Sequence, residues 1–321
     1  MRCFILAGGY ATRLWPLTEK RSKPLLPIAG KPLLTHLIEK IPASMEVTVS
    51  TNSVFEEAFD TWIQGLHRPN ITLEIEDTKH EDHKLGALGA LGMWLEEKKI
   101  QEDVLVLTGD NYLGFDLAEF LKHFDGASPL LAAHDIGDIS KASAFGTVLA
   151  KGESPVMDVM GFEEKPKDPK TSLVSTGCFV LPRNTIPLTI AHAKRKPDNV
   201  GGIFEEFLAQ GIAVRAFVFT DPWLDIGSFA SYLAAHRLLV HGKTLLGSES
   251  QVDGETSCNE SVCIGDRSTI KKSSLADCIV MDDCRIEDCV LKDCIVDDGC
   301  VLKGVDLTGK MIRAGTSLAK S

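Results

Sequence analysis

The sequence of 321 residues lacks several features that mark particular classes of protein. Positive charge is not in excess, because 34 lysines and arginines against 45 acidic residues give a net charge of −11. Such a balance disfavours a nucleic acid or an anionic membrane surface as a partner. The longest uncharged, mostly apolar run, 85–95, is about half of the roughly 20 residues that a membrane-spanning helix needs. Because no cationic and then apolar leader opens the chain, we expect a cytoplasmic protein.

Cysteine is present, but not in the pattern of a disulfide scaffold. The nine cysteines are an odd number in a long chain without a secretory signal, so we interpret them as reduced. The composition changes near residue 245: the last proline is Pro222 and the last aromatic residue is Tyr232, whereas seven cysteines fall between Cys258 and Cys300. We therefore expect two domains, 1–245 and 246–321.

The first part alternates short apolar runs with helical patterns. Strands are expected at 3–7, 46–51, 71–76, 103–108 and 214–219, and helices at 32–40, 54–66, 85–98, 117–124 and 228–240. This alternation predicts an α/β fold, a Rossmann-like and mainly parallel sheet flanked by helices. Ligands of such folds bind outside the carboxyl ends of the strands, so the loops that follow strands are the place to look for functional residues.

The second part is a repeat with a period of 16 residues. Segment 275–284 matches segment 291–300, and 261–266 falls in the same frame one period earlier. Aliphatic residues recur every five or six positions from Ile264 to Leu302, and five cysteines each lie two residues before one of them. Since alternate residues of a strand share a face, both sets are expected to point inward. The pattern resembles the small left-handed parallel β-helix of hexapeptide-repeat proteins, although a coil of 16 residues is not three strict hexapeptides.

The cysteines and acids of the repeat are assigned no chemistry. A metal cluster or a redox relay is the alternative for the cysteines, but their fixed phase with the aliphatic residues favours small, buried and inert side chains. The aspartates of the repeat are interpreted as solvated corners; they are Asp282, Asp283, Asp288, Asp297 and Asp298.

The clearest chemical signal follows the first predicted strand. Small residues at 6–9 let backbone amides approach an anion or a base edge, and Arg13 and Lys23 supply positive charge for phosphates. The third glycine of a dinucleotide-binding fingerprint and the Gly-Lys-Ser/Thr ending of a P-loop are both missing.

The segment resembles the signature of the sugar-1-phosphate nucleotidylyltransferases, Leu-Ala-Gly-Gly-x-Gly-Thr-Arg-Leu-x-Pro-Leu-Thr followed by Lys-Pro-x-x-Pro. It departs at Ala11, where the family usually has glycine, and because alanine resists positive φ we expect a slightly reshaped loop there. The resemblance implies a glycosyltransferase-A-like nucleotidyltransferase domain. It also implies nucleotide contacts by Leu6, Ala7, Gly8, Gly9, Thr12 and Gly86.

Further motifs follow in the family's order. Asp110 closes an apolar strand in Thr-Gly-Asp-Asn, and Asp225 precedes a predicted helix in Trp-Leu-Asp-Ile-Gly-Ser. Together they resemble the family's two metal-binding aspartates, which implies Mg²⁺, while helix capping or an Asx turn is the alternative for each. Glu164 and Lys165 match a Glu-Lys-Pro motif that contacts the sugar and its phosphate, with a surface ion pair as the alternative.

Three strand residues and one loop complete the set of motifs that resemble the family. Gly146, Thr176 and Gly177 match positions where the sugar lies against backbone, although strand glycines more often mark bulges. Segment 85–91 is more similar to the Pro-Leu-Gly-Thr-Ala-Gly form of guanylyl and related transferases than to the Gln…Asp-Gly-Leu-Ala-Gln form of thymidylyl enzymes, whereas 77–84 fits neither. His80 and His83 are interpreted as exposed loop residues. The base and sugar stay open between dTTP with glucose 1-phosphate and GTP with mannose 1-phosphate.

The resemblance implies that a sugar 1-phosphate oxygen attacks the α-phosphorus of a nucleoside triphosphate and that pyrophosphate leaves. Two unit charges 4 Å apart interact by ~4 kcal/mol at an effective dielectric near 20, so charge neutralisation dominates the barrier. The implied contacts are pyrophosphate for Arg13, the α-phosphate for Lys23 and the sugar phosphate for Lys165. A sugar phosphate is already ionised at neutral pH, so no general base is required.

Two other functions compete with this one. A non-catalytic subunit that binds nucleotide sugars would keep the fold but lose a catalytic residue, and all of them are retained. Acyl transfer by the β-helix usually needs a catalytic histidine, and none occurs from Glu249 onward. We therefore expect the β-helix to assemble or brace the subunits of a homo-oligomer.

Overall fold

The computed structural model describes residues 1–9, 12–76 and 85–320 and groups the chain into two compact units. The sheet unit is Met1–Gly9 with Leu37–Trp223, and the β-helix unit is Tyr10–His36 with Leu224–Ser321. The segment after the first strand is thus grouped with the C-terminal residues, and the domain boundary at 245 stays a prediction. Ala11, His80 and His83 lie outside the described residues.

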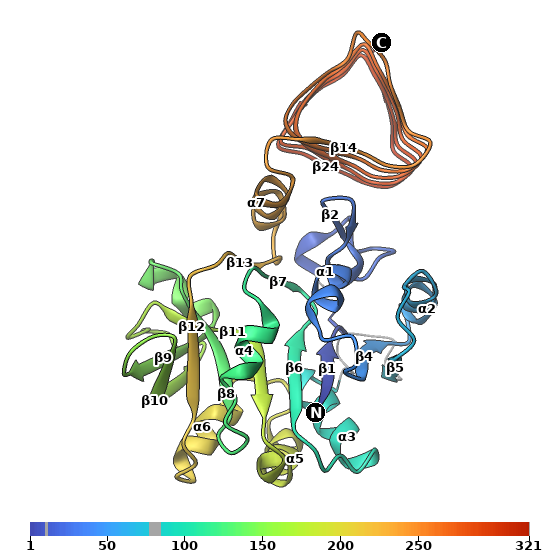
Figure 1. Cartoon of the computed structure of the whole chain (residues 1–321). Coiled ribbons are helices and arrows are strands. Elements are labelled where there is room, and N and C mark those ends of the chain that lie inside the picture. Colours follow the sequence, from blue (N-terminus) through green and yellow to red (C-terminus); the bar gives the residue numbers. More distant parts are fainter. Residues whose placement is uncertain (10–11, 77–84, 321) are drawn as a thin grey trace. The chain divides into compact units, whose positions relative to one another are not determined.

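A nine-stranded sheet forms the centre of the sheet unit, in the order β5-β4-β1-β6-β11-β8-β12-β10-β9 (Figure 1). In chain order these strands are β1 (Arg2–Leu6), β4 (Val47–Asn52), β5 (Ile71–Glu76), β6 (Val104–Thr108), β8 (Leu130–Asp135), β9 (Gly146–Lys151), β10 (Val156–Glu164), β11 (Leu173–Leu181) and β12 (Arg215–Phe219). The run β5-β4-β1-β6 is parallel, as is the pair β8–β12, whereas β10 and β11 lie antiparallel to their neighbours. All five predicted strands are confirmed, as β1, β4, β5, β6 and β12.

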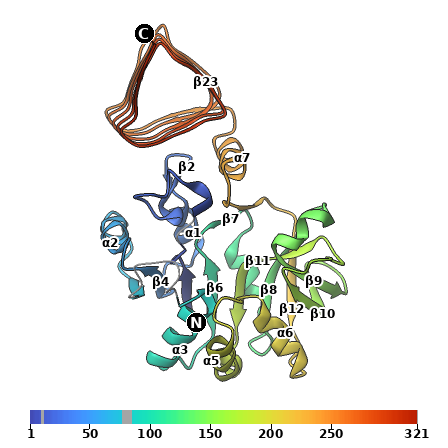
Figure 2. The ribbon, with the colours of Figure 1, turned by 180° about the vertical axis from the view of Figure 1, so that it is seen from behind.

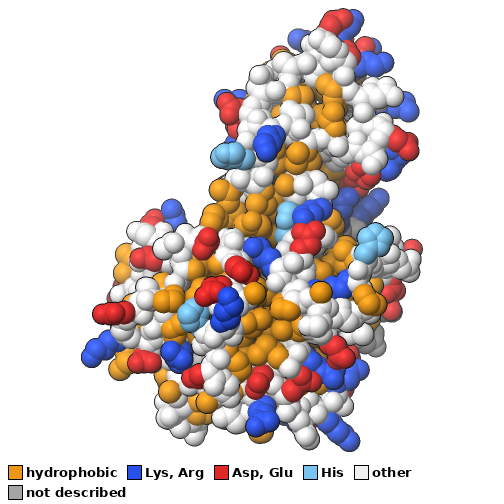
Figure 3. Space-filling view, in the orientation of Figure 1, with side chains coloured by type: hydrophobic (Ala, Val, Ile, Leu, Met, Phe, Trp, Pro, Cys, Tyr) orange, Lys and Arg blue, Asp and Glu red, His pale blue; other side chains and the backbone are white. Residues whose placement is uncertain are grey.

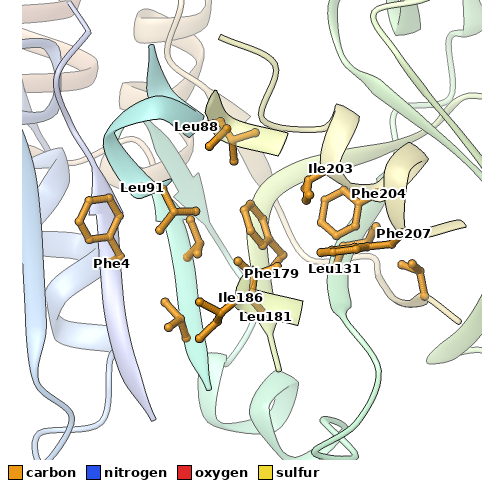
Figure 4. Close-up of a cluster of buried hydrophobic side chains, with 14 of the residues drawn as sticks. Phe4, Leu88, Leu91, Leu131, Phe179, Leu181, Ile186, Ile203, Phe204 and Phe207 are labelled. Atoms are coloured by element: carbon orange, nitrogen blue, oxygen red, sulfur yellow. The ribbon is translucent and has the colours of Figure 1, made fainter. Parts of the chain in front are cut away.

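Helices cover both faces of this sheet. They are α2 (Glu56–Gln64), α3 (Ala87–Glu97), α4 (Leu117–Lys122), α5 (Ile186–Arg195) and α6 (Gly202–Ala209), and α1 (Leu33–Lys40) is divided between the two units. On one face, side chains of α3, α5 and α6 join those of the strands in a continuous buried cluster (Figure 4). Ala216 of β12 belongs to this cluster, whereas the next residue, Phe217, contacts Phe120 of α4 with ring centroids 5.6 Å apart. Both faces of the sheet are therefore covered, as in other α/β folds.

The β-helix unit contains short parallel strands wound into a triangular prism (Figures 1 and 2). They are β14 (Thr244–Leu246), β15 (Gln251–Val252), β16 (Ser257–Ile264), β17 (Thr269–Lys271), β18 (Ser274–Val280), β19 (Arg285–Glu287), β20 (Val290–Lys292), β21 (Ile295–Val296), β22 (Val301–Lys303), β23 (Asp306–Thr308), β24 (Met311–Ile312) and β25 (Ser317–Ala319). Leu275 pairs with Leu291 and Ile286 with Leu302, one 16-residue period apart. The predicted repeat is therefore confirmed.

The cysteines of the repeat are buried structural residues. Cys278, Cys284, Cys289, Cys294 and Cys300 are each at most 2% exposed. The thiol of Cys284 donates to the carbonyl oxygen of Asp297 in the next coil at 3.1 Å, and one coil earlier the Ser268 hydroxyl donates in the same way to Met281 at 2.9 Å. Burial raises the pKa of Cys278 to about 12, so its thiol stays protonated. Among the described residues, no three His, Cys, Asp or Glu side chains gather as a metal site would require.

The interpretation of Asp297 as a solvated corner is wrong. Asp283 is a solvated corner, with 54% of its side chain exposed, but only 8% of the Asp297 side chain is exposed. The period places both at corners, but Arg21, which is far away in the sequence, covers Asp297. Elsewhere, charged side chains of both signs are spread over the β-helix surface (Figure 3).

Short elements from the N-terminal part of the chain and one helix belong to the same unit. They are η1 (Thr12–Leu14), η2 (Lys23–Leu25), the hairpin of β2 (Pro27–Ile28) and β3 (Lys31–Pro32), and α7 (Phe229–Val240). The Tyr232 hydroxyl of α7 donates to the Pro27 carbonyl at 2.6 Å, and the His236 ring bonds to the Ser261 carbonyl of β16 at 2.9 Å. No helix within the described ranges has the length and apolar character needed to cross a bilayer.

Candidate active site

The parallel strands β5, β4, β1 and β6 end at the same edge of the sheet, and the loop of small residues begins there. The Gly8 carbonyl accepts a hydrogen bond from Asn52 Nδ2 at the end of β4, at 3.1 Å. The Gly109 N–H, just after β6, donates to the Leu6 carbonyl at 2.8 Å. A Cβ at Gly109 would lie 3.2 Å from the Cβ of Ala7. Residues 6–9 are therefore held between the ends of β4 and β6.

Glu76 is the residue at this edge that sequence reasoning missed. It ends β5 and is 6% exposed, and its Oε1 accepts a hydrogen bond from the Ser50 hydroxyl at 2.7 Å. A Cβ at Gly8 would lie 2.9 Å from the same Oε1, so the carboxyl group abuts the loop and would have to shift to admit a side chain there. Burial raises the pKa of Glu76, and the Ser50 hydrogen bond acts in the opposite direction. The only sequence signal was an acid closing an otherwise β-type run.

Asp110 follows β6 directly. The strand β7 (Asn111–Leu113) comes next, so Asp110 is not the cap of a helix. Asn111 Nδ2 donates to Asp110 Oδ1 at 2.8 Å and to the Thr108 hydroxyl at 2.7 Å, while its Oδ1 accepts from Trp223 Nε1 at 2.9 Å. The Asn111 amide is thereby fixed and holds the Asp110 carboxylate in one orientation.

Glu164 lies between two glycines. A Cβ added to Gly146 would lie 2.8 Å from Glu164 Oε2, and a Cβ added to Gly201 would lie 2.0 Å from the same atom. The Glu164 backbone N–H donates to Glu205 Oε1 at 2.9 Å. Burial raises the pKa of Glu164, against the opposing effect of Lys165. The Glu164 side chain is 18% exposed and its Oε1 lies 3.9 Å from Lys165 Nζ, so the two residues form a long ion pair that is buried on the Glu164 side.

Lys165 and the other predicted sugar residues are placed as follows. Lys165, with φ of 47°, lies just past β10 with its side chain largely exposed. Thr176 is buried and its hydroxyl donates to the Ala132 carbonyl at 3.0 Å. Gly177 lies in a bulge of β11 with φ of 74°, where a Cβ would be 2.3 Å from Thr108 Oγ1. Gly86, with φ of 79°, precedes α3 against the Pro197 carbonyl.

The other predicted site residues belong to the β-helix unit. Thr12 and the exposed Arg13 are in η1, and Lys23 opens η2 and is 7% exposed. Lys23 Nζ lies 3.5 Å from Asp225 Oδ1, so the unit itself brings a cation to this carboxylate. Asp225 ends β13 (Trp223–Asp225), and helix α7 is capped by Ser228 with a capping box to Ser231. The capping alternative for Asp225 is therefore wrong.

Comparison with known protein families shows to which family the chain belongs. The model of the family described as nucleotidyl transferase matches residues 2–241, and the chain belongs to this family. Together with the relatives below, the match defines it as a sugar-1-phosphate nucleotidyltransferase, an enzyme of nucleotide-sugar biosynthesis. The predicted fold class and reaction are thus confirmed. Members of the family generally use a divalent metal ion, together with nucleoside triphosphate and sugar phosphate substrates.

Two relatives carry the same kind of name. A mannose-1-phosphate guanylyltransferase of Mycobacterium tuberculosis is 32% identical over 247 residues, which cover 74% of this chain and 64% of that protein. A protein of Sulfolobus acidocaldarius described as a mannose-1-phosphate guanyltransferase is 26% identical over 280 residues, 84% of this chain and 72% of that protein. The chain spans only part of the length of these curated relatives.

Two solved structures share the fold. A structure described as a glucose-1-phosphate thymidylyltransferase from Bacillus anthracis has a TM-score of 0.63 at 23% identity and covers 74% of this chain and 95% of its own. A UDP-glucose pyrophosphorylase complexed with UDP-glucose has a TM-score of 0.60 at 18% identity, covering 74% and 97%. At these identities the likeness shows the fold alone.

Proposed function

We propose that this enzyme transfers the guanylyl group of GTP to mannose 1-phosphate. The observation that supports the base is Glu76, whose carboxyl lies against the glycine loop. The Watson–Crick edge of guanine presents two adjacent donors, N1–H and the N2 amino group, and a carboxylate offers two acceptor oxygens. Uracil and thymine present one N–H between two carbonyl oxygens, which a carboxylate would repel. The names of the two relatives above support the same pair of substrates.

The site residues take the roles implied by the family signature. Arg13 would bind the departing pyrophosphate, Lys23 the α-phosphate and Lys165 the sugar phosphate. Glu164 would accept hydrogen bonds from sugar hydroxyls beside the backbone of Gly146, Thr176 and Gly177. Nucleotide contacts would come from Leu6, Ala7, Gly8, Gly9, Thr12 and Gly86. The new bond joins a sugar-phosphate oxygen to the α-phosphorus, and pyrophosphate leaves with the electrons of the broken bond, so no proton is transferred.

We propose Mg²⁺ as the divalent ion, with Asp110 and Asp225 as its protein ligands. Carboxylate oxygens supplemented by phosphate oxygens are the donor set that Mg²⁺ prefers in proteins, and these carboxylates are not used as helix caps. When bound, the ion would neutralise phosphate charge. Asn111 would keep the Asp110 carboxylate oriented, and Lys23 would balance Asp225 until substrate arrives.

The experiment is pyrophosphate release across four nucleoside triphosphates and four sugar phosphates, those of glucose, mannose, galactose and N-acetylglucosamine. GTP with mannose 1-phosphate should give the highest kcat/KM, and chelation should abolish the signal until Mg²⁺ is restored. A maximum with dTTP and glucose 1-phosphate would overturn the choice of substrates. Asp110→Ala should lose at least about 100-fold in kcat, and unchanged turnover would remove Asp110 from the proposed metal site, whereas no pyrophosphate release with any pair of substrates would support a non-catalytic subunit.

We further propose a homo-oligomer assembled through the β-helix. Light scattering of the full chain and of a chain ending at residue 245 tests this, because loss of the β-helix should reduce the mass to that of a monomer.

A further inference from the structure

Two ion pairs join the segment just before Lys23 to the last coils of the β-helix. Arg21 Nη1 lies 3.4 Å from Asp297 Oδ1 and 2.7 Å from Met281 Sδ, and its Nη2 binds Asp298. Two residues earlier, Glu19 Oε2 accepts from Arg313 Nε at 2.7 Å. All of these residues belong to the β-helix unit.

The carboxylates that bind Arg21 are held rigidly. Asp298 is the last member of a ladder in which each aspartate accepts a backbone N–H from the coil before it. Asp282 N–H donates to Asp298 Oδ1 at 3.1 Å, and Asp266 N–H donates to Asp282 Oδ1 at 2.9 Å. Asp297 is buried and accepts the Asp298 N–H at 2.9 Å. Arg21 therefore binds an anchor whose position the repeat itself fixes.

The segment on the other side of Arg21 has little freedom. Lys23 is buried in η2, where the Leu25 N–H donates to the Ser22 carbonyl at 2.9 Å and the Leu26 N–H to the Lys23 carbonyl at 3.0 Å. A single residue separates Arg21 from Lys23. A displacement of Arg21 would therefore also displace the Lys23 ammonium group. Leaving Asp297 buried without its partner would be unfavourable, which favours the contact between Asp297 and Arg21.

We propose that Arg21, bound by Asp297 and Asp298, is a positioning residue for Lys23, so that the β-helix contributes to nucleotidyl transfer as well as to assembly. The inference rests on the proposed function, in which Lys23 binds the α-phosphate. Arg21 itself touches no substrate. It sets where the Lys23 charge stands when the pentacoordinate α-phosphorus forms, and an error of about 1 Å there costs on the order of 100-fold in rate.

The test is a double-mutant cycle in the full chain with Arg21→Gln, Lys23→Ala and the combination, measured at steady state with both substrates in excess over enzyme. Arg21→Gln should lower kcat by about 10- to 100-fold while KM for either substrate changes less than about threefold. Arg21→Lys should recover part of the loss. In the Lys23→Ala background, Arg21→Gln should have no further effect, because the group that it positions is gone.

Arg267→Gln is the matched control, because Arg267 binds Asp283 through two bonds of 2.7 Å on the same β-helix. It should leave kcat unchanged, and thermal unfolding of every variant shows that each is folded at the assay temperature. The inference is overturned if Arg21→Gln loses no more activity than Arg267→Gln, or if its loss is the same with and without Lys23. Full activity of Lys23→Ala would instead remove the role of Lys23 from the proposed function.

Discussion

Replacing Glu76 by glutamine tests the proposed base preference most directly. The amide has the same shape and its carbonyl can still accept from Ser50, so the fold should be kept. However, an NH2 group replaces one of the two acceptor oxygens, and this donor would face a guanine N–H, which is also a donor. Losing a hydrogen bond to a charged, buried group costs about 1.5–3 kcal/mol, which corresponds to roughly 10- to 150-fold in kcat/KM for GTP. UTP and dTTP should gain, because an amide complements their N3–H and carbonyl.

The assay is kcat/KM for GTP, UTP and dTTP with mannose 1-phosphate held constant. Glu74→Gln is the matched control on the same strand, since the Glu74 carboxylate pairs with Lys98 at 3.1 Å. If GTP falls no further in Glu76→Gln than in Glu74→Gln, or if all three triphosphates fall alike, the reasoning is refuted.

The remaining predictions concern packing, thiol chemistry and pH. Gly201→Ala should raise KM for the sugar phosphate about tenfold, because its Cβ would displace Glu164 Oε2 from 2.0 Å, whereas Gly254→Ala, with no atom within 4 Å of its Cβ, should be neutral in the same assay. Ellman's reagent at pH 8 should leave the buried thiols unmodified until the chain is denatured, with half-buried Cys258 as the fastest to react; rapid reaction of five or more native thiols would contradict the inert assignment. Burial raises the pKa of Glu76, so the native state keeps a proton that the unfolded chain loses. The free energy of unfolding should therefore fall as pH rises from the unfolded to the folded pKa of Glu76, and urea titrations should show this step smaller in Glu76→Gln.

The repeat and the parallel strands could be predicted because their signals are local. In the β-helix, each inward position is set by alternation within a short strand, so Ile286 and Leu302 are buried where the period placed them. The helices α5 and α6 have weaker local signals at their starts. Gly201 precedes α6 without a side-chain cap, and α5 begins after Thr185, which makes no cap hydrogen bond either. Side-chain capping is absent at both starts, and the start signal that is present is Pro187 in the first turn of α5, so both helices depend mainly on their packing against the sheet.

The site was predicted less completely because its supporting contacts join distant residues. The Asn111 amide oxygen accepts from Trp223, 112 positions later, and Asp297 is contacted by Arg21, 276 positions earlier. Neither separation leaves a pattern in a single sequence. Glu76 was missed for another reason: an acid that ends a strand is ordinary, and its meaning depends on the glycine that it abuts.

The distribution of the proposed catalytic residues over the two units changes what the β-helix is expected to do. The sheet unit holds the glycine loop, Glu76, Asp110 and Glu164, whereas Lys23 and Asp225 belong to the unit that contains the β-helix. In that unit the aspartate ladder fixes Arg21 two residues from Lys23, and α7 bonds through Tyr232 to the hairpin that follows. A β-helix that served assembly alone would not need to hold Arg21. Removing it would take away both carboxylates that hold Arg21, so its loss should lower kcat by an amount that cannot be recovered by restoring the oligomer.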